Sequence, residues 1–159
     1  MEANRASRQV SPRQELLLLY LALPATGGVK EFTDPIRVMK GLFVYEQEAP
    51  VSWRKPGATY EFVAYNYGPC SFQVYDDLAA LQRAGLVKTK RHPGNEWNYF
   101  GLTATGRALA ERIREKWDSR LVDYLARIKD VFSRMSFVSL LRAVYSKYPN
   151  YARNSLLRS

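Results

Sequence analysis

The sequence has very little of the side-chain chemistry that enzymes and metal sites commonly use. Its 159 residues include one cysteine, Cys70, and one histidine, His92. A single thiol cannot form a disulfide framework or a thiolate metal cluster, and it suits the reducing cytoplasm. The sequence also has no glycine-rich phosphate loop, no metal-ligand spacing and no carboxylate pair at a recognisable catalytic site. We therefore expect a protein that is not an enzyme and that needs no cofactor and no metal.

Long hydrophobic runs are absent as well. The longest apolar run, LLLLYLAL at residues 16–23, covers eight residues. A helix that crosses a bilayer needs about 20 apolar residues, and no small-residue cleavage site of a secretory signal follows the run. We expect a soluble protein in the cytoplasm, with no membrane among its partners.

The composition is that of a folded, strongly basic protein. Hydrophobic residues make up 47% and aromatic residues 13% of the chain, enough for one domain with a core. The net charge is +9, which favours a polyanionic partner such as nucleic acid. The excess lies late in the chain, because residues 104–159 hold twelve Lys and Arg against five Asp and Glu.

Helix signals divide the first half of the chain into three helices. Ser11 and Pro12 open a first, buried helix over residues 11–23. Asp34 and the proline after it open a second helix that ends near residue 47. The third helix begins at Ser71, after a Gly-Pro break, and ends at Gly85. Its spacing places four residues in the core: Phe72, Tyr75, Leu78 and Leu81.

The second half begins with a β-hairpin and continues with helices. The runs LVKTKR and EWNYFGL flank a four-residue tip at residues 92–95. Thr103 caps the next helix, and apolar residues then recur every three or four positions as far as Met135. We expect one long helix here, or two helices nearly in line with a kink at residues 118–119. Ser136 starts a last helix, which Pro149 ends.

This order of elements is that of a winged helix-turn-helix. The expected fold class is mainly α with a small β wing, followed by C-terminal amphipathic helices. The expected parts are a flexible basic arm at residues 1–11, a winged-helix domain at 12–103 and a C-terminal helical region at 104–159. The last part covers the core or forms a dimer interface, because its apolar seam is longer than a small domain needs. We therefore predict a homodimer.

In a winged helix, the third helix enters the major groove and the wing reaches the adjacent backbone. We predict that the 71–84 helix and the 86–102 wing bind double-stranded DNA, as in a transcriptional regulator. The candidate contact residues are Ser71, Gln73, Arg83, Lys88, Lys90, Arg91, His92 and Asn95. Gln73 can make a bidentate contact to adenine, and the wing cations can meet phosphates. The alternative for the wing is a solvated edge hairpin whose lysines discourage strand pairing.

Two features of the third helix and its surroundings leave alternatives open. Asp76 and Asp77 are expected on the outer face of the helix, where carboxylates repel phosphates at short range. They face away from the groove, read cytosine amino groups, or meet a protein partner instead of DNA. The aromatic residues Tyr60, Phe62, Tyr65 and Tyr67 form a stacking platform for single strands or pack beneath the helix. Packing is favoured because no cations are interleaved with them.

The segment FVAYNYGPCSFQVYDDLAALQRAGLV, preceded by IRVMKGLFVYEQE, resembles the YwgA-like small winged-helix proteins of bacteria and archaea. The resemblance covers residues 12 to 155 and implies a winged-helix fold with a regulatory role. The same YGP signature occurs in Panacea-type antitoxins, which are similar to SocA, so the resemblance also implies an alternative role as an antitoxin or as a subunit of a regulatory or defence complex. The spacer at residues 47–71 is longer than a simple helix-turn-helix has, which affects how the second and third helices dock.

Overall fold

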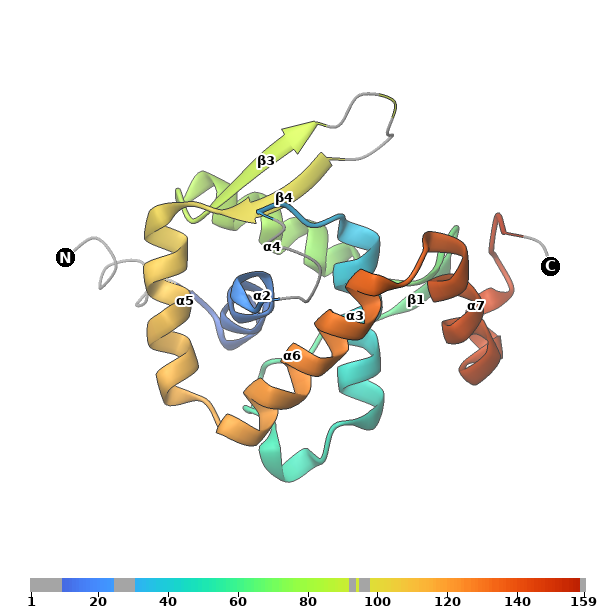
Figure 1. Ribbon diagram of the computed structural model, residues 1–159, viewed down its shortest axis with the longest axis horizontal. Helices are drawn as coiled ribbons and strands as arrows, with labels where there is room; N and C mark the ends of the chain where they lie inside the picture. Colours follow the sequence, from blue (N-terminus) through green and yellow to red (C-terminus); the bar gives the residue numbers. More distant parts are fainter. Residues whose placement is uncertain (1–9, 25–30, 92–93, 95–97, 158–159) are drawn as a thin grey trace.

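The computed structural model describes residues 10–24, 31–91, 94 and 98–157. The described chain is mainly helical and carries two small antiparallel sheets (Figure 1). Most of the predicted arm, residues 1–9, lies outside the described part, as do His92 and Asn95. In chain order the elements are α2 (Pro12–Ala22), α3 (Pro35–Glu48), η1 (Val51–Trp53), β1 (Val63–Tyr65), β2 (Gly68–Cys70), α4 (Phe72–Arg83), β3 (Val87–Arg91), β4 (Asn98–Leu102), α5 (Ala104–Lys116), α6 (Ser119–Arg134), α7 (Phe137–Lys147) and η2 (Pro149–Ala152).

Helix α2 is the central element of the core. It begins as predicted, with Ser11 accepting from the Gln14 N–H and the Gln14 side chain accepting in return from the Ser11 N–H. Its leucines at positions 16 to 19 are completely buried. Figure 1 shows α2 nearly end-on, enclosed by α5, α6, α3 and the β3–β4 hairpin. The apolar run of the sequence is therefore the centre of the hydrophobic core.

The long spacer after α3 folds into a β-hairpin. Helix α3 starts at the predicted cap, Asp34, which accepts from the Arg37 N–H at 2.8 Å. Strands β1 and β2 then pair antiparallel, with Tyr65 opposite Gly68. The Gly-Pro pair that the sequence suggests as a break before α4 lies instead in strand β2. Gly68 has a φ of +87°, which favours glycine, and a Cβ there would lie 2.8 Å from Cε1 of Tyr145.

Helix α4 leads through Gly85 into the predicted hairpin. Gly85 has a φ of +77°, the left-handed conformation that a helix C-terminus needs. Strands β3 and β4 pair antiparallel, with Val87 opposite Leu102. The segment before α3 joins the other edge of β4 through one bridge, in which Thr33 and Phe100 exchange backbone hydrogen bonds of 2.8 and 2.9 Å.

The long apolar seam after Thr103 is divided between two helices. The break falls at Trp117 and Asp118, within one residue of the kink predicted at 118–119. The prediction of one long helix or of two helices nearly in line is wrong, because α5 and α6 run in clearly different directions (Figure 1). Helix α5 packs against α2, and α6 packs against α3. Leu121 and Leu125 are completely buried. The apolar seam thus packs against α2 and α3 within the protein. Its length is therefore no longer a reason to predict a dimer.

The C-terminal segment closes over the β1–β2 hairpin. The ring of Tyr151 meets the edge of Phe43, with centroids 4.6 Å apart. The Leu156 N–H donates to the Asn66 carbonyl at 2.8 Å, and the Asn154 amide donates to the Ala64 carbonyl at 3.1 Å. These contacts hold the hairpin between α3 and the end of the chain.

A buried carboxylate joins α4 to α2 and to the spacer. Asp77 is only 4% exposed, so the expectation that it lies on the outer face of α4 is wrong. Its oxygens accept from Arg13 Nε at 2.7 Å, from Gln14 Nε2 at 3.1 Å and from the Tyr60 hydroxyl at 2.8 Å. Asp76, the next residue, is exposed. The two neighbouring acids therefore have different roles.

Replacing Asp77 should destabilise the fold, whereas replacing Asp76 should not. Asp77→Ala leaves Arg13 and Tyr60 without their shared acceptor, and we expect a loss of about 2 to 3 kcal/mol in the free energy of unfolding. Asp76→Ala is the matched control and should change this free energy by less than about 0.5 kcal/mol. Urea unfolding followed by circular dichroism measures both. Equal losses in the two variants would contradict the assigned role of Asp77.

Candidate nucleic-acid interface

The exposed face of α4 is mixed in character. Val74, Leu78 and Leu81 are buried together with Asp77. Phe72 and Tyr75 are 53% and 38% exposed, so the prediction that they belong to the core is wrong. The physical reason is the set of partners around Asp77, which turns that side of the helix inward. The outer face consequently presents aromatic residues near its N-terminus and Arg83 in its last turn.

The side chains of two predicted contact residues at the start of α4 are buried or hydrogen-bonded within the protein. Ser71 stands at the N-cap position but is completely buried, so it offers no surface to a duplex. Gln73 accepts a hydrogen bond from the Glu61 N–H at 2.9 Å through its side-chain oxygen. A bidentate contact to adenine needs both the oxygen and the nitrogen of the amide. Gln73 therefore holds the spacer against α4 rather than standing free for base readout.

The cations of β3 point to both sides of the hairpin. Lys88 forms an ion pair with Glu31, which lowers the pKa of that carboxyl group. The ammonium groups of Lys88 and Lys90 lie 5.3 and 5.6 Å from the centroid of the Phe32 ring. Since side chains alternate along a strand, Thr89 and Arg91 face the opposite side. The predicted wing cations do not form one surface.

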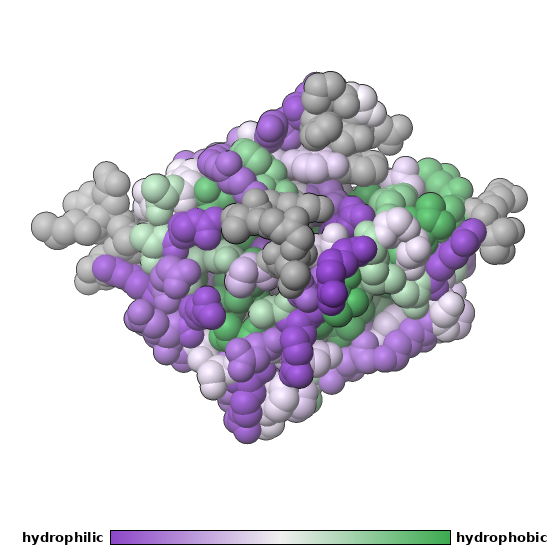
Figure 2. All heavy atoms as spheres, viewed as in Figure 1, coloured by the Kyte–Doolittle hydropathy of each residue, from purple (hydrophilic) through white to green (hydrophobic). Residues whose placement is uncertain are grey.

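The side of β3 that carries Thr89 and Arg91 lies next to the C-terminal end of α4. The Gln82 amide approaches the Thr89 hydroxyl at 3.5 Å, which identifies the Thr89 and Arg91 side as the α4 side. Arg83 and Arg91 are exposed, and no described carboxylate forms an ion pair with either of them. We call Gln82, Arg83, Thr89 and Arg91 the α4–β3 surface. Figure 2 shows hydrophilic residues gathered along the β3–β4 edge at the top of the view.

A pocket opens beside the aromatic end of α4. Its volume is about 250 Å³, and it is lined by residues of α3, of the β1–β2 hairpin and of α4. Lys40, which is 1% exposed, lies in its lining and donates to the Pro69 carbonyl at 2.9 Å. Tyr60 is buried and Phe62 half-buried, as packing predicts, but Tyr65 is 44% exposed and meets Phe72 edge-on at 5.3 Å. We call this the Lys40 pocket.

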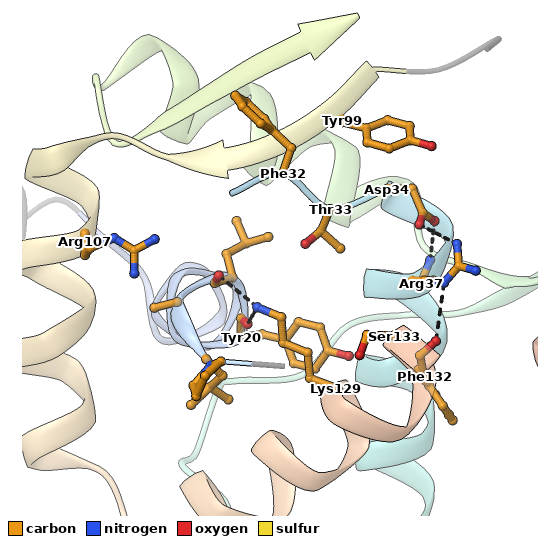
Figure 3. Close-up of a pocket in the computed structure, with 14 residues that line it drawn as sticks. Tyr20, Phe32, Thr33, Asp34, Arg37, Tyr99, Arg107, Lys129, Phe132 and Ser133 are labelled. Atoms are coloured by element: carbon orange, nitrogen blue, oxygen red, sulfur yellow. Dashed lines mark hydrogen bonds and ion pairs between the residues drawn. The ribbon is translucent and has the colours of Figure 1, made fainter. Parts of the chain in front are cut away.

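A second cavity of about 240 Å³ lies among α2, α3, α6 and β4 (Figure 3). Its most buried cation, Lys129, donates to the carbonyls of Tyr20 and Leu21 at 2.8 and 2.9 Å. Arg37 donates to the Asp34 carboxylate at 2.8 Å and to the Met135 carbonyl at 2.9 Å. Lys129 and Arg37 therefore tie neighbouring helices together, each through at least two hydrogen bonds to acceptors of the fold.

The described residues lack two further kinds of feature, a metal-binding cluster and a membrane-spanning helix. No group of three His, Cys, Asp or Glu side chains in that part of the chain could hold a metal ion. No helix there is long and apolar enough to cross a membrane. Cys70 is buried, and burial raises the pKa of its thiol.

Lys40 should make stability depend on pH in a defined direction. Burial lowers its pKa to about 8, while Cys70 and Asp34 act weakly in the opposite sense. An unfolded lysine has a pKa of about 10.4, so between these values the unfolded chain binds the proton and the folded chain does not. The free energy of unfolding should therefore rise with pH, by about 2 kcal/mol between pH 7 and pH 9.5 from this group.

Lys40→Met removes this contribution, and groups common to both proteins cancel in the comparison. Urea unfolding of wild type and variant at the two pH values measures the difference. If the two proteins respond to pH in parallel, Lys40 titrates at its ordinary value in the folded state.

Comparison of the chain with protein-family models, with curated proteins and with solved structures found no match. The resemblance to the YwgA-like proteins stays a prediction from the sequence.

Proposed function

We propose that the protein is a DNA-binding regulator of the winged-helix type that contacts double-stranded DNA through the α4–β3 surface. The observation that carries the proposal is the exposure of Arg83, beside Gln82 at the end of α4, and of Arg91, on the side of β3 that Gln82 approaches, both without a described acidic partner. A net charge of +9 adds a general attraction to the phosphate backbone.

The arrangement of the elements supports this assignment. A helix that ends at a left-handed glycine and leads straight into a projecting hairpin can present its last turn and that hairpin to the same duplex. The bridge between Thr33 and Phe100 gives the hairpin a third extended segment at its base. The end of α4 near Arg83 is favoured over its beginning, because Asp76 and the aromatic residues lie toward the beginning.

Lys88 has a smaller part in this proposal than the sequence indicates. Its charge is already opposed by Glu31, and its side chain lies on the face away from the α4–β3 surface. Lys88 therefore contributes little to phosphate binding on the α4 side. It also provides a control for the loss of one positive charge from the same strand.

Replacing both arginines should weaken DNA binding and its dependence on salt. For Arg83→Ala/Arg91→Ala, we expect the magnitude of the slope of log affinity against log salt to fall by about 2. Each phosphate contact releases about one counterion on binding, and the double variant loses two such contacts. Lys88→Ala should change the slope by less than about 0.5. Fluorescence anisotropy of a labelled duplex from the protein's own upstream region measures both.

A scrambled duplex in the same titration tests regulation as opposed to general attraction. A regulator should bind the upstream duplex at least about a hundredfold more tightly than the scrambled one. Equal, weak binding to both duplexes that is unchanged by the double substitution would contradict the proposal.

The second candidate is a non-catalytic interaction module, such as an antitoxin or a subunit of a regulatory or defence complex. The observation that favours it is the exposure of Phe72 and Tyr65 at the beginning of α4, since aromatic residues are common at the centres of protein interfaces. This candidate predicts a stable complex with the product of an adjacent gene when the two are produced together. Phe72→Ser should dissociate that complex in gel filtration and leave DNA binding unchanged.

A further inference from the structure

The Lys40 pocket exists because of the β1–β2 hairpin. A simple helix-turn-helix joins its second and third helices by a short turn. Here the hairpin stands between α3 and α4, and its residues Tyr65, Asn66 and Tyr67 form one wall of the pocket. Helix α3 provides Lys40, and α4 provides a further part of the lining. The long spacer thus forms a concave site together with α3 and α4.

Lys40 gives the pocket its charge. An ammonium group has three N–H donors, and among the described residues the Pro69 carbonyl is the one acceptor that Lys40 has. No carboxylate is among the lining residues. Asp34, the acid whose charge acts on Lys40, is held by Arg37 at 2.8 Å. The buried cation therefore has donors to offer to an anion in the pocket.

The side of the pocket that the start of α4 forms with Tyr65 is aromatic and exposed to solvent. Phe72 and Tyr75 come from α4 and Tyr65 from β1, and the rings of Tyr65 and Phe72 pack edge to face at 5.3 Å. All three side chains are more than a third exposed. Flat apolar groups pack well against such rings, and ligand pockets commonly combine apolar walls with few polar groups.

We propose that the Lys40 pocket binds a small organic carboxylate with a flat apolar body. The carboxylate lies against the Lys40 ammonium, and the body lies against Tyr65, Phe72 and Tyr75. A volume of about 250 Å³ admits a molecule of one or two fused rings. If Lys40 served only to tie the hairpin to α3, the pocket would show no preference for a negative charge.

The probe is 2-naphthoate, and the uncharged control is 2-naphthamide, which has nearly the same shape. Isothermal titration calorimetry on the full chain should give saturable binding of naphthoate with a Kd below about 1 mM. Naphthamide should bind at least about tenfold more weakly, because a charge-assisted hydrogen bond is lost. The titration contains no DNA, so its outcome is separate from that of the salt experiment.

Two variants locate the site, and a third controls for stability. Lys40→Met should weaken naphthoate binding by about tenfold or more, and Phe72→Ala, at an exposed position, by about threefold to tenfold. Lys129→Met removes the other buried lysine, outside the pocket, and should leave the Kd within about twofold. Circular dichroism confirms that each variant is folded. Absence of saturable binding, equal affinity for naphthoate and naphthamide, or full binding by folded Lys40→Met would overturn the proposal.

Discussion

The orientation of α4 depends on the buried carboxylate of Asp77. A charged group can be buried only when its oxygens are satisfied, and here an arginine, an amide and a phenol from two distant segments supply the donors. The contact ties α4 to the start of α2 and to the middle of the spacer. It also sets which side of α4 faces solvent. The exposure of Phe72, Tyr75 and Arg83 follows from the burial of Asp77.

The β1–β2 hairpin is the second feature that determines how α4 is placed. It stands between α3 and α4, and it is held from three sides. Lys40 binds its Pro69 carbonyl, Gly68 allows Tyr145 to approach closely, and the segment around Leu156 hydrogen-bonds to its turn. Because this support comes from α3, α7 and the C-terminal segment, the hairpin is a fixed part of the fold. Its placement gives α4 two different surfaces, an aromatic one beside the pocket and a cationic one beside β3.

The features of this structure that depend on neighbouring residues can be predicted from the sequence. Caps at Ser11, Asp34, Thr103 and Ser136, and the left-handed Gly85, could all be predicted because each depends on residues within one helical turn. The same holds for the break near Asp118. The directions of α5 and α6 could not be predicted, because they depend on packing against α2 and α3.

The candidate site was predicted less well for a physical reason. Helical spacing favours Tyr75 over Asp77 for the core. The spacing does not reveal that Arg13 and Tyr60, which are 64 and 17 residues from Asp77 in the sequence, donate hydrogen bonds to its carboxylate. Charge counting likewise treats Lys88 and Arg91 alike, although only the former meets Glu31. Lys40 was not singled out, and no local signal marks it, because its burial results from a hairpin that the sequence only partly indicates.

Chemical-shift mapping of the labelled protein with a short DNA duplex tests the central claim most directly. If α4 and β3 present one DNA-binding surface, the amide signals of Gln82, Arg83, Thr89 and Arg91 should shift most as the duplex is added. The signals of α7 and of the β1–β2 hairpin should stay in place. Shifts concentrated around Tyr65 and Phe72, or on α5 and α6, would show that the duplex meets another surface and would contradict the assignment.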